Sequence, residues 1–573
     1  MRGPCAGEAQ SSQRRQLSGR KAAALAFLAY SVMAVWVTWP LATAPARLGF
    51  PNMDVYGNMW AMAWVDRQAL RDPLHLFESN MFFPWTKSLG YAESLLPQAL
   101  QAGVLRASGA SVLQAYNGVL LLTFALSGLG AYLLAAEISG SRSAGFLAGL
   151  GFGFFAYRWH HIVHLQSLST QWLPLALLCA RHAMRTPAPR HLVGLGLFCL
   201  LQVLSSGYYA MLVALAVGLT LFWEWRAGGH STRLLLRALL ALILAAGLAL
   251  PVFLEHREIQ ARHGFSRGRT EAVAWSARFA SYLEPGPFSE LPHLAALRAW
   301  TKDGEPLFPG TWALAFGTLG LGLCWRSRDA RLCGLFLLLG LSLSLGPVVS
   351  LFGLSMPGPF ELFRLLPGGA LLRTPARLGV LAVLGLDLLA AMAWARFLAP
   401  RRAHRMLFGL AAAAIAIEAS PSELRGAIRE MPRPPAVAEW LAGAERGAVL
   451  ELPWNEPADC ALYLYWSTVH WQPMVNGFGS FDPPGNFGLG LLGNRWPSEY
   501  SARVFRGKAI RYVLLHTDRL KPGHRQRLLA AAGRLPSGVS LLASLGADRI
   551  YAIDPAGEKE KPSEPEGFSP TAR

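Results

Sequence analysis

Long runs of apolar residues recur along this chain of 573 residues and constrain its fold more than any other feature. A helix that crosses a bilayer needs about 20 mainly apolar residues, and about eleven segments approach that requirement. Only 15% of the residues are charged, whereas soluble domains carry about 25%. The sequence therefore predicts an integral membrane protein, and its formal net charge of +18 does not by itself indicate nucleic-acid binding.

One apolar run, 191–223, is too long for a single crossing. As one helix it would measure about 50 Å, far more than the bilayer core. Ser205, Ser206 and Gly207 provide a turn in its middle, so we divide it into two helices. We expect the other spanning helices near residues 22–43, 112–137, 144–158, 165–180, 238–254, 310–324, 332–353, 376–395 and 406–420.

Basic residues cluster in alternate loops, which predicts the orientation in the membrane. The basic N-terminus, 1–21, is expected in the cytoplasm, and the two long loops, about 44–94 and 255–309, on the outer face of the cell (inner) membrane. The predicted cytoplasmic loops carry Arg142, then Arg181, Arg185 and Arg190, then Arg226, Arg233 and Arg237, then Arg326, Arg328 and Arg331, and finally Arg396, Arg401, Arg402 and Arg405.

The chain changes character after the last apolar run. Residues 430–555 contain strand-like segments, GAVLELP, AIRYVLLH and SLLASLGADRIYAI, around a helix-like LYLYWSTVHW. This alternation indicates a small α/β domain, which follows a transmembrane domain at 22–421 and is expected outside the cell membrane. The tail, 556–573, is rich in Pro and Glu and is expected to be disordered. The predicted fold class is thus an all-α polytopic membrane protein with a small C-terminal α/β extracytoplasmic domain.

The first long outer loop contains the most informative candidate residue, Asp54. Trp60 and Trp64 follow at a spacing of four, which suits an amphipathic helix at the membrane surface with tryptophans at headgroup depth. Asp54 would then face the membrane–water boundary, where a carboxylate can act as a general base. The alternative is that Asp54 is only the N-cap of a helix starting at Val55.

Other polar residues fall in predicted outer loops. His160, His161 and His164 form one cluster, in which the spacing of His161 and His164 predicts one helical face. They are candidates for holding a phosphate, against the alternative of ordinary interfacial polar residues. They could also bind a divalent metal, but three near-adjacent histidines without an acid are a weak signal for one. Arg257, Arg373 and Arg377 are candidates for holding a phosphate, against the alternative of solvated surface charges. Asp387 is the single acid deep inside a predicted helix, where ionisable residues are often functional.

Four stretches together resemble the GT-C superfamily of membrane glycosyltransferases, especially the dolichyl-phosphate-mannose protein mannosyltransferase type and its bacterial relatives. They are MDVYGNMWAMAWVDRQALRDPLHLFESNMFFP, FFAYRWHHIVHLQSLSTQWLPLALL, GEPLFPGTWAL and LFRLLPGGALLRTPARLGVLAV. The resemblance implies that the loop acid of that superfamily corresponds to Asp54. Many relatives have a second acid in the next outer loop, whereas the corresponding loop here, RWHHIVH, has none.

This resemblance implies an enzyme that moves a sugar from a polyprenyl-phosphate donor to a glycan, lipid or protein acceptor on the extracytoplasmic face. Asp54 would be the base and no cofactor is certain. Two other classes remain open from the sequence: a polytopic transporter or lipid flippase, and a membrane assembly protein whose C-terminal domain binds a partner. A transporter would show a central passage containing Asp387, whereas an enzyme would show an outer cavity.

Overall fold

The computed structural model describes residues 6–286, 291–301, 305–351, 353–366, 368–420, 422–531 and 534–555. The predicted disordered tail, 556–573, lies outside the described residues, as do the first five residues of the predicted cytoplasmic N-terminus. The chain divides into two compact units. Unit 1 contains Met1–Phe50, Leu95–Leu254 and Gly264–Met431, and unit 2 contains Pro51–Ser94, Glu255–His263 and Pro432–Arg573.

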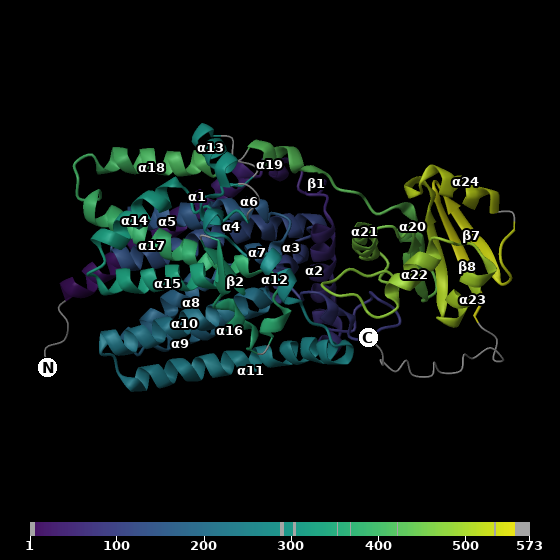
Figure 1. Cartoon of the computed structure of the whole chain (residues 1–573), viewed down its shortest axis with the longest axis horizontal. Coiled ribbons are helices and arrows are strands. Elements are labelled where there is room, and N and C mark those ends of the chain that lie inside the picture. Colours follow the sequence, from purple (N-terminus) through teal and green to yellow (C-terminus); the bar gives the residue numbers. More distant parts are fainter. Residues whose placement is uncertain are drawn as a thin grey trace. The chain divides into compact units, whose positions relative to one another are not determined.

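Unit 1 is a helical bundle, and Figure 1 shows its long helices with their axes roughly parallel. Each predicted spanning segment coincides with at least part of an observed helix. The helices at these positions are α1 (Ala6–Val37), α4 (Val112–Ser139), α5 (Arg142–Phe154), α8 (Trp172–Arg185), α9 (Pro189–Ser205), α10 (Gly207–Gly228), α11 (Thr232–His263), α14 (Thr311–Leu323), α15 (Arg328–Ser344), α17 (Val380–Phe397) and α18 (His404–Glu418).

Six spans in the described part of the chain are long and apolar enough to cross a membrane, which makes this a multi-pass membrane protein. They are Gly19–Val37, Val112–Ser139, Gly207–Gly228, Thr232–His263, Pro375–Phe397 and His404–Ala427. The expected number of about eleven is therefore not confirmed, because five helices at predicted positions are shorter. The long run 191–223 is interrupted as predicted, since Ser206 has extended backbone between α9 and α10.

The core of unit 1 centres on α17, whose residues Val380–Leu389 are all buried. The helices α14 and α15 pack closely against it. Shorter elements complete the unit: α3 (Leu96–Ala107), α6 (Ala156–His160), α7 (Leu165–Leu168), α12 (Arg269–Ala274), α13 (Pro292–Thr301), α16 (Phe360–Arg364), α19 (Ser422–Ala427), the hairpin β2 (Val348–Leu351) and β3 (Leu354–Pro357), and the pair β1 (Leu48–Gly49) and β4 (Arg429–Glu430).

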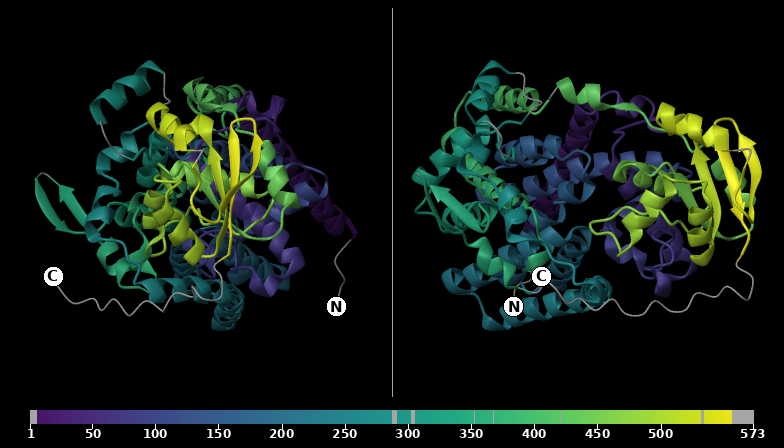
Figure 2. Two further views of the ribbon diagram at one scale, coloured as in Figure 1. Left: turned by 90° about the vertical axis from the view of Figure 1, so that its right-hand side faces the viewer. Right: turned by 45° about the vertical axis from the view of Figure 1, so that its right-hand side comes forward.

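Unit 2 contains a four-stranded sheet in the order β5-β6-β8-β7, seen in yellow and green in Figure 2. Its strands are β5 (Ala448–Leu452), β6 (Ile510–His516), β7 (Val539–Leu545) and β8 (Asp548–Ile553). The pair β5–β6 is parallel, whereas β6–β8 and β7–β8 are antiparallel. The helices of the α/β region are α20 (Ala436–Gly443), α21 (Pro457–Ser467), α22 (Asn486–Gly493), α23 (Glu499–Gly507) and α24 (Pro522–Ala531).

The first long loop belongs to unit 2, where its helix α2 (Met53–Arg71) packs against α21. Trp60 is 1% exposed and donates a hydrogen bond to the Asn80 side chain at 2.9 Å. Trp64 is 7% exposed, and its indole lies 5.7 Å from that of Trp471. The interpretation of Trp60 and Trp64 as interfacial anchors is therefore wrong. The same apolar spacing fits a helix buried against protein, and the C-terminal segments supply that partner.

Candidate functional site

A short irregular segment between α5 and α8 carries the three clustered histidines. Arg158, only 1% exposed, fixes its shape. The guanidinium donates to the Gly153 carbonyl at 2.8 Å, to the Leu168 carbonyl at 2.9 Å and to the Thr170 hydroxyl at 3.2 Å. These bonds join the end of α5 to the end of α7. The loop that presents the histidines is therefore held at both ends by one buried side chain.

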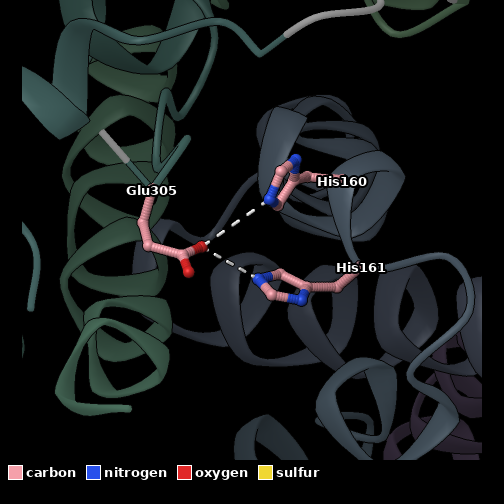
Figure 3. Close-up of side chains that lie close together, drawn as sticks. All are labelled: His160, His161 and Glu305. Atoms are coloured by element: carbon pink, nitrogen blue, oxygen red, sulfur yellow. Dashed lines mark hydrogen bonds and ion pairs between the residues drawn. The ribbon is translucent and has the colours of Figure 1, made fainter. Parts of the chain in front are cut away.

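His161 meets an acidic residue that lies far away in the sequence, Glu305. The His161 Nε2 atom lies 3.1 Å from Glu305 Oε2, and His160 Nε2 lies 3.9 Å from the same oxygen (Figure 3). His161 and Glu305 side chains are 6% and 9% exposed, whereas His160 is 39% exposed. Glu305 precedes α14 in the second long loop. The structure thus supplies the acid that the segment RWHHIVH itself lacks.

His164 extends this cluster through a ring–ring contact. Its Nδ1 atom lies 3.3 Å from His161 Nδ1. His161 and His164 do not share a helical face, as their spacing of three predicted, because His161 follows the end of α6 and His164 precedes α7. A backbone hydrogen bond of 2.9 Å from His164 to His161 instead closes a turn. A neutral His164 that donates to His161 would leave the other ring nitrogen of His161 protonated and facing Glu305.

Burial keeps these imidazoles neutral. It lowers the pKa of His161 well below the ordinary value, with the Arg377 charge adding to the effect. Burial also lowers the pKa of His164 to about 3. The pKa of Glu305 is raised by burial, although His160 and Arg377 oppose that shift. Neutral imidazoles can donate hydrogen bonds to a phosphate or bind a metal ion, so the state of the cluster suits either role.

Arg377 brings a positive charge to the same cluster. It is 8% exposed, and its guanidinium lies 4.5 Å from the centre of the Tyr208 ring. The Tyr208 hydroxyl in turn accepts a hydrogen bond of 3.1 Å from the Arg373 backbone. The Arg373 side chain is half exposed and pairs with Glu271 at 3.5 Å. Of the two arginines, Arg377 is thus the one held inside unit 1 beside the histidines.

A cavity of about 560 Å³ opens beside the cluster. His160 and Glu305 contribute to its wall, together with Ser276, Arg278 and Ser350. Apolar groups, including those of Trp275, Phe279 and Leu345, complete the lining. A pocket of this size with a few convergent polar groups is typical of a small-molecule site.

The cluster also fits the ligand requirements of a divalent metal. One nitrogen each from His160 and His161 and one oxygen of Glu305 lie within 4.8 Å of one another. Two imidazoles and one carboxylate form the three-ligand set of many catalytic zinc sites, which keep a fourth position open. His164 would then orient His161 from behind, as second-layer partners of metal ligands do.

The remaining predicted site residues, Asp54 and Arg257, belong to unit 2. Asp54 lies in the first turn of α2, but Asn52 is the N-cap, because its side chain accepts a 2.9 Å hydrogen bond from the Asp54 backbone. The alternative that Asp54 merely caps this helix is therefore wrong. Arg257 is exposed on α11.

Glu305 is the residue that the sequence analysis missed. It stands 144 positions after His161, within GEPLFPGTWAL, a stretch that already carried part of the family resemblance. An acid shortly before an apolar helix, in a loop predicted to lie on the outer face, is the signal that could have identified it.

The fold and this cluster define a multi-pass membrane protein with a polar cavity beside the ends of its helices. No protein-family model matches the sequence, and no curated protein matches it. Among solved structures, the chain is similar to the arabinofuranosyltransferase AftD from Mycobacteria, with a TM-score of 0.61 and 18% identity over 94% of this chain and 40% of that chain. A second structure, of an AftD mutant, gives a TM-score of 0.53 at 16% identity over 93% and 41% of the two chains.

ArnT from Cupriavidus metallidurans is also similar, with a TM-score of 0.47 and 14% identity over 93% of this chain and 99% of that chain. The chain spans only about 40% of the length of AftD, the first of these structures. At these identities the likeness to AftD concerns the fold. The predicted resemblance to glycosyltransferases is thus matched by a likeness in fold to one of them, AftD.

Proposed function

We propose that this chain is a membrane glycosyltransferase that moves a pentose or hexose from a polyprenyl-phosphate donor to an acceptor on the extracytoplasmic face. The observation that carries the proposal is the buried pair of His161 and Glu305, with Arg377 close by, beside a cavity of about 560 Å³. The fold likeness to an arabinofuranosyltransferase supports it, but fold alone does not determine function.

In the proposed reaction, the bond between the sugar C1 and the donor phosphate oxygen breaks, and a bond between C1 and an acceptor oxygen forms. The polyprenyl phosphate leaves with its negative charge. Arg377 and the neutral histidines can stabilise that charge by hydrogen bonds in a site of low polarity. When a divalent ion is bound by His160, His161 and Glu305, it supplies further positive charge for the phosphate. Asp54 is proposed to take the proton of the acceptor hydroxyl.

The alternative function, a transporter or flippase, would use Asp387 in its substrate pathway, and the surroundings of this residue do not favour that role. This side chain is 0% exposed, and Gly151 of α5 lies so close that an added methyl group would contact its carboxylate. Neither carboxylate oxygen has a hydrogen-bond partner among the described residues. A substrate pathway would require polar surroundings or water at this position, and the described residues around Asp387 provide no polar partner.

The test measures transfer from radiolabelled polyprenyl-phosphate sugars in membranes that contain the full chain. We expect a labelled glycoside to form, and Glu305→Gln to reduce its rate on the order of 10–100-fold, because the variant loses the carboxylate that orients His161 and that would help to hold a metal ion. Glu423→Gln changes an exposed acid of the same unit and should have no effect. Label that crosses the bilayer without forming a glycosidic product would indicate a flippase instead.

A further inference from the structure

The surface of unit 2 contains a groove that the proposed reaction does not use. It encloses about 550 Å³ between α22, α23 and the segment Pro84–Trp85. Aromatic rings of Trp85 and Tyr500 contribute to its lining, together with Leu491. All of these residues belong to unit 2.

The helix α22 is apolar on two sides, although only one of them is covered. Leu489 and Leu492 are partly buried against the core below the sheet. Phe487 and Leu491, which are one helical turn apart and so lie on one face, are 71% and 55% exposed. Tyr500 on α23 is 66% exposed. Large apolar side chains gathered at one exposed site indicate an interaction surface.

Two cations complete the groove. Arg495 follows α22 and Lys508 ends α23, and both line the cavity. Within the described part of the chain, no acidic residue lines this groove, and neither cation forms an ion pair. The only other polar side chains in the lining are those of Asn486 and Tyr500. The groove therefore presents uncompensated positive charge next to exposed apolar surface.

We infer that this groove binds an anionic phospholipid of the bilayer in which the chain is anchored. Arg495 and Lys508 would hold the phosphate headgroup, Trp85 and Tyr500 would lie at headgroup depth, and Phe487 and Leu491 would contact acyl chains. An acidic glycan could use the same cations and aromatic rings. It would not explain why Phe487 and Leu491 are left exposed, so the lipid accounts for more of the surface.

The experiment follows amide hydrogen exchange of α22 and α23 in the full chain, reconstituted in nanodiscs of phosphatidylcholine with or without phosphatidylglycerol. Two basic residues near an anionic surface should increase the affinity of the groove for that surface by roughly thirtyfold. We therefore expect slower exchange of both helices in the anionic discs. The double variant R495A/K508A should lose this difference, whereas Arg503→Ala, which removes an exposed cation of α23 outside the groove, should keep it.

Four results would overturn the inference. Equal exchange in both kinds of disc, or a difference that survives in R495A/K508A, would remove the lipid as the ligand. Protection by inorganic phosphate alone in phosphatidylcholine discs would indicate a site for free anions. Protection by trigalacturonate in the same discs would indicate a glycan site. Because none of these measurements depends on sugar transfer, their outcome is independent of the proposed enzymatic function.

Discussion

Asp54 is the residue whose replacement separates chemistry from folding most directly. Asn52 already caps α2, so Asp54→Asn should leave the helix intact while it removes the proposed base. We expect a normal amount of protein in the membrane and a loss of transfer on the order of 10²–10⁴-fold, the usual contribution of a general base. Transfer of labelled sugar at saturating donor concentration measures the effect.

Three control variants accompany this one. Asp66→Asn changes an acid within α2, and Asp72→Asn changes the residue that caps the C-terminal end of this helix. Both variants should retain most activity. Asn52→Ala should cost about 1 kcal/mol of helix stability, as the loss of an N-cap does, without abolishing transfer. A fully active Asp54→Asn protein would contradict the catalytic role of Asp54.

At the residue scale, the sequence singled out those candidate residues whose partners are close in the sequence or whose position is unusual for their charge. The histidines stood out because they are adjacent, and Arg377 because arginine in an outer segment runs against the charge rule. Glu305 could not be paired with His161 from sequence, since only the tertiary fold closes the 144-residue separation. Trp60 and Trp64 were assigned to the wrong surroundings, because their spacing fits a bilayer surface and a protein surface equally well.

Among the elements, the contact of α14 with α17 depends on glycine. A methyl group on Gly320 would lie 2.2 Å from the Leu389 carbonyl oxygen, so the two backbones pack directly. Gly320→Ala should therefore destabilise the bundle by about 1–3 kcal/mol, as overpacking does. Gly322→Ala, where nothing lies within 4 Å, should be neutral or slightly stabilising, because alanine favours helix. Thermal unfolding in detergent compares the two, and equal midpoints would contradict the close contact.

The sheet of unit 2 contains a buried ionic triad on β5, β6 and β8. His516 lies 3.0 Å from Glu451 and 2.8 Å from Asp548. Burial alone would lower the pKa of His516, but the hydrogen bonds that its protonated ring donates to the carboxylates of Asp548 and Glu451 outweigh burial and raise that pKa to about 9. Because the pKa of His516 is higher in the folded than in the unfolded protein, the protonated ring stabilises the fold. This stabilisation is complete below the unfolded-state pKa of about 6.5 and is lost as the pH rises through 9.

We therefore expect the sheet of unit 2 to lose up to about 3 kcal/mol of stability between pH 6.5 and 9. Amide hydrogen exchange on β6 and β8, corrected for the intrinsic pH dependence, measures this in the full chain. His516→Gln cannot titrate and should be less stable at pH 6.5, with a flatter profile. Opening free energies in the unaltered protein that stay constant from pH 6.5 to 9 would contradict the prediction.

Elements were predicted best where one physical signal dominates. The division of 191–223 follows from helix length alone, and the observed break at Ser206 confirms it. The segments GAVLELP and AIRYVLLH contain β5 and β6, whereas LYLYWSTVHW, which starts at Leu462, covers only the second half of α21. Boundaries were poorest for α11, which continues to His263, because its last turns are stabilised by contacts such as the 3.2 Å hydrogen bond from the His256 ring to the Gly90 carbonyl and not by an apolar pattern.

For the whole molecule, side-chain contacts within unit 1 sort the loops into two groups. Arg181 in the second half of α8 pairs with Asp329 at the start of α15, at 2.8 Å, and with Glu224 near the end of α10, at 3.2 Å. These are all segments that the charge pattern assigns to the cytoplasm. His161 after α5 instead meets Glu305 before α14, and both were assigned to the outer face. Neither cluster mixes segments assigned to opposite faces.

The separation of these two side-chain clusters indicates that the shorter helices also cross the membrane. The six long spans are an even number, which alone would leave the two ends of the chain on the same side. The five shorter helices, α5, α8, α9, α14 and α15, have 13 to 17 residues. The shortest would extend only about 20 Å, less than the bilayer core of about 30 Å. Yet α14 follows Glu305 and ends just before Arg328 and Asp329, so it connects the two clusters.

We therefore predict that the N-terminus lies in the cytoplasm and the C-terminal domain outside, with an odd number of crossings. Alkaline phosphatase, which is active only outside the cytoplasm, should be active when fused after Pro555 and inactive when fused after Gly229, between α10 and α11. A fluorescent reporter that folds only in the cytoplasm should give the opposite pattern. If the fusion after Pro555 reports a cytoplasmic location, the orientation is reversed or the number of crossings is even. Either result would also remove Asp54 from the outer face, where the proposed transfer takes place.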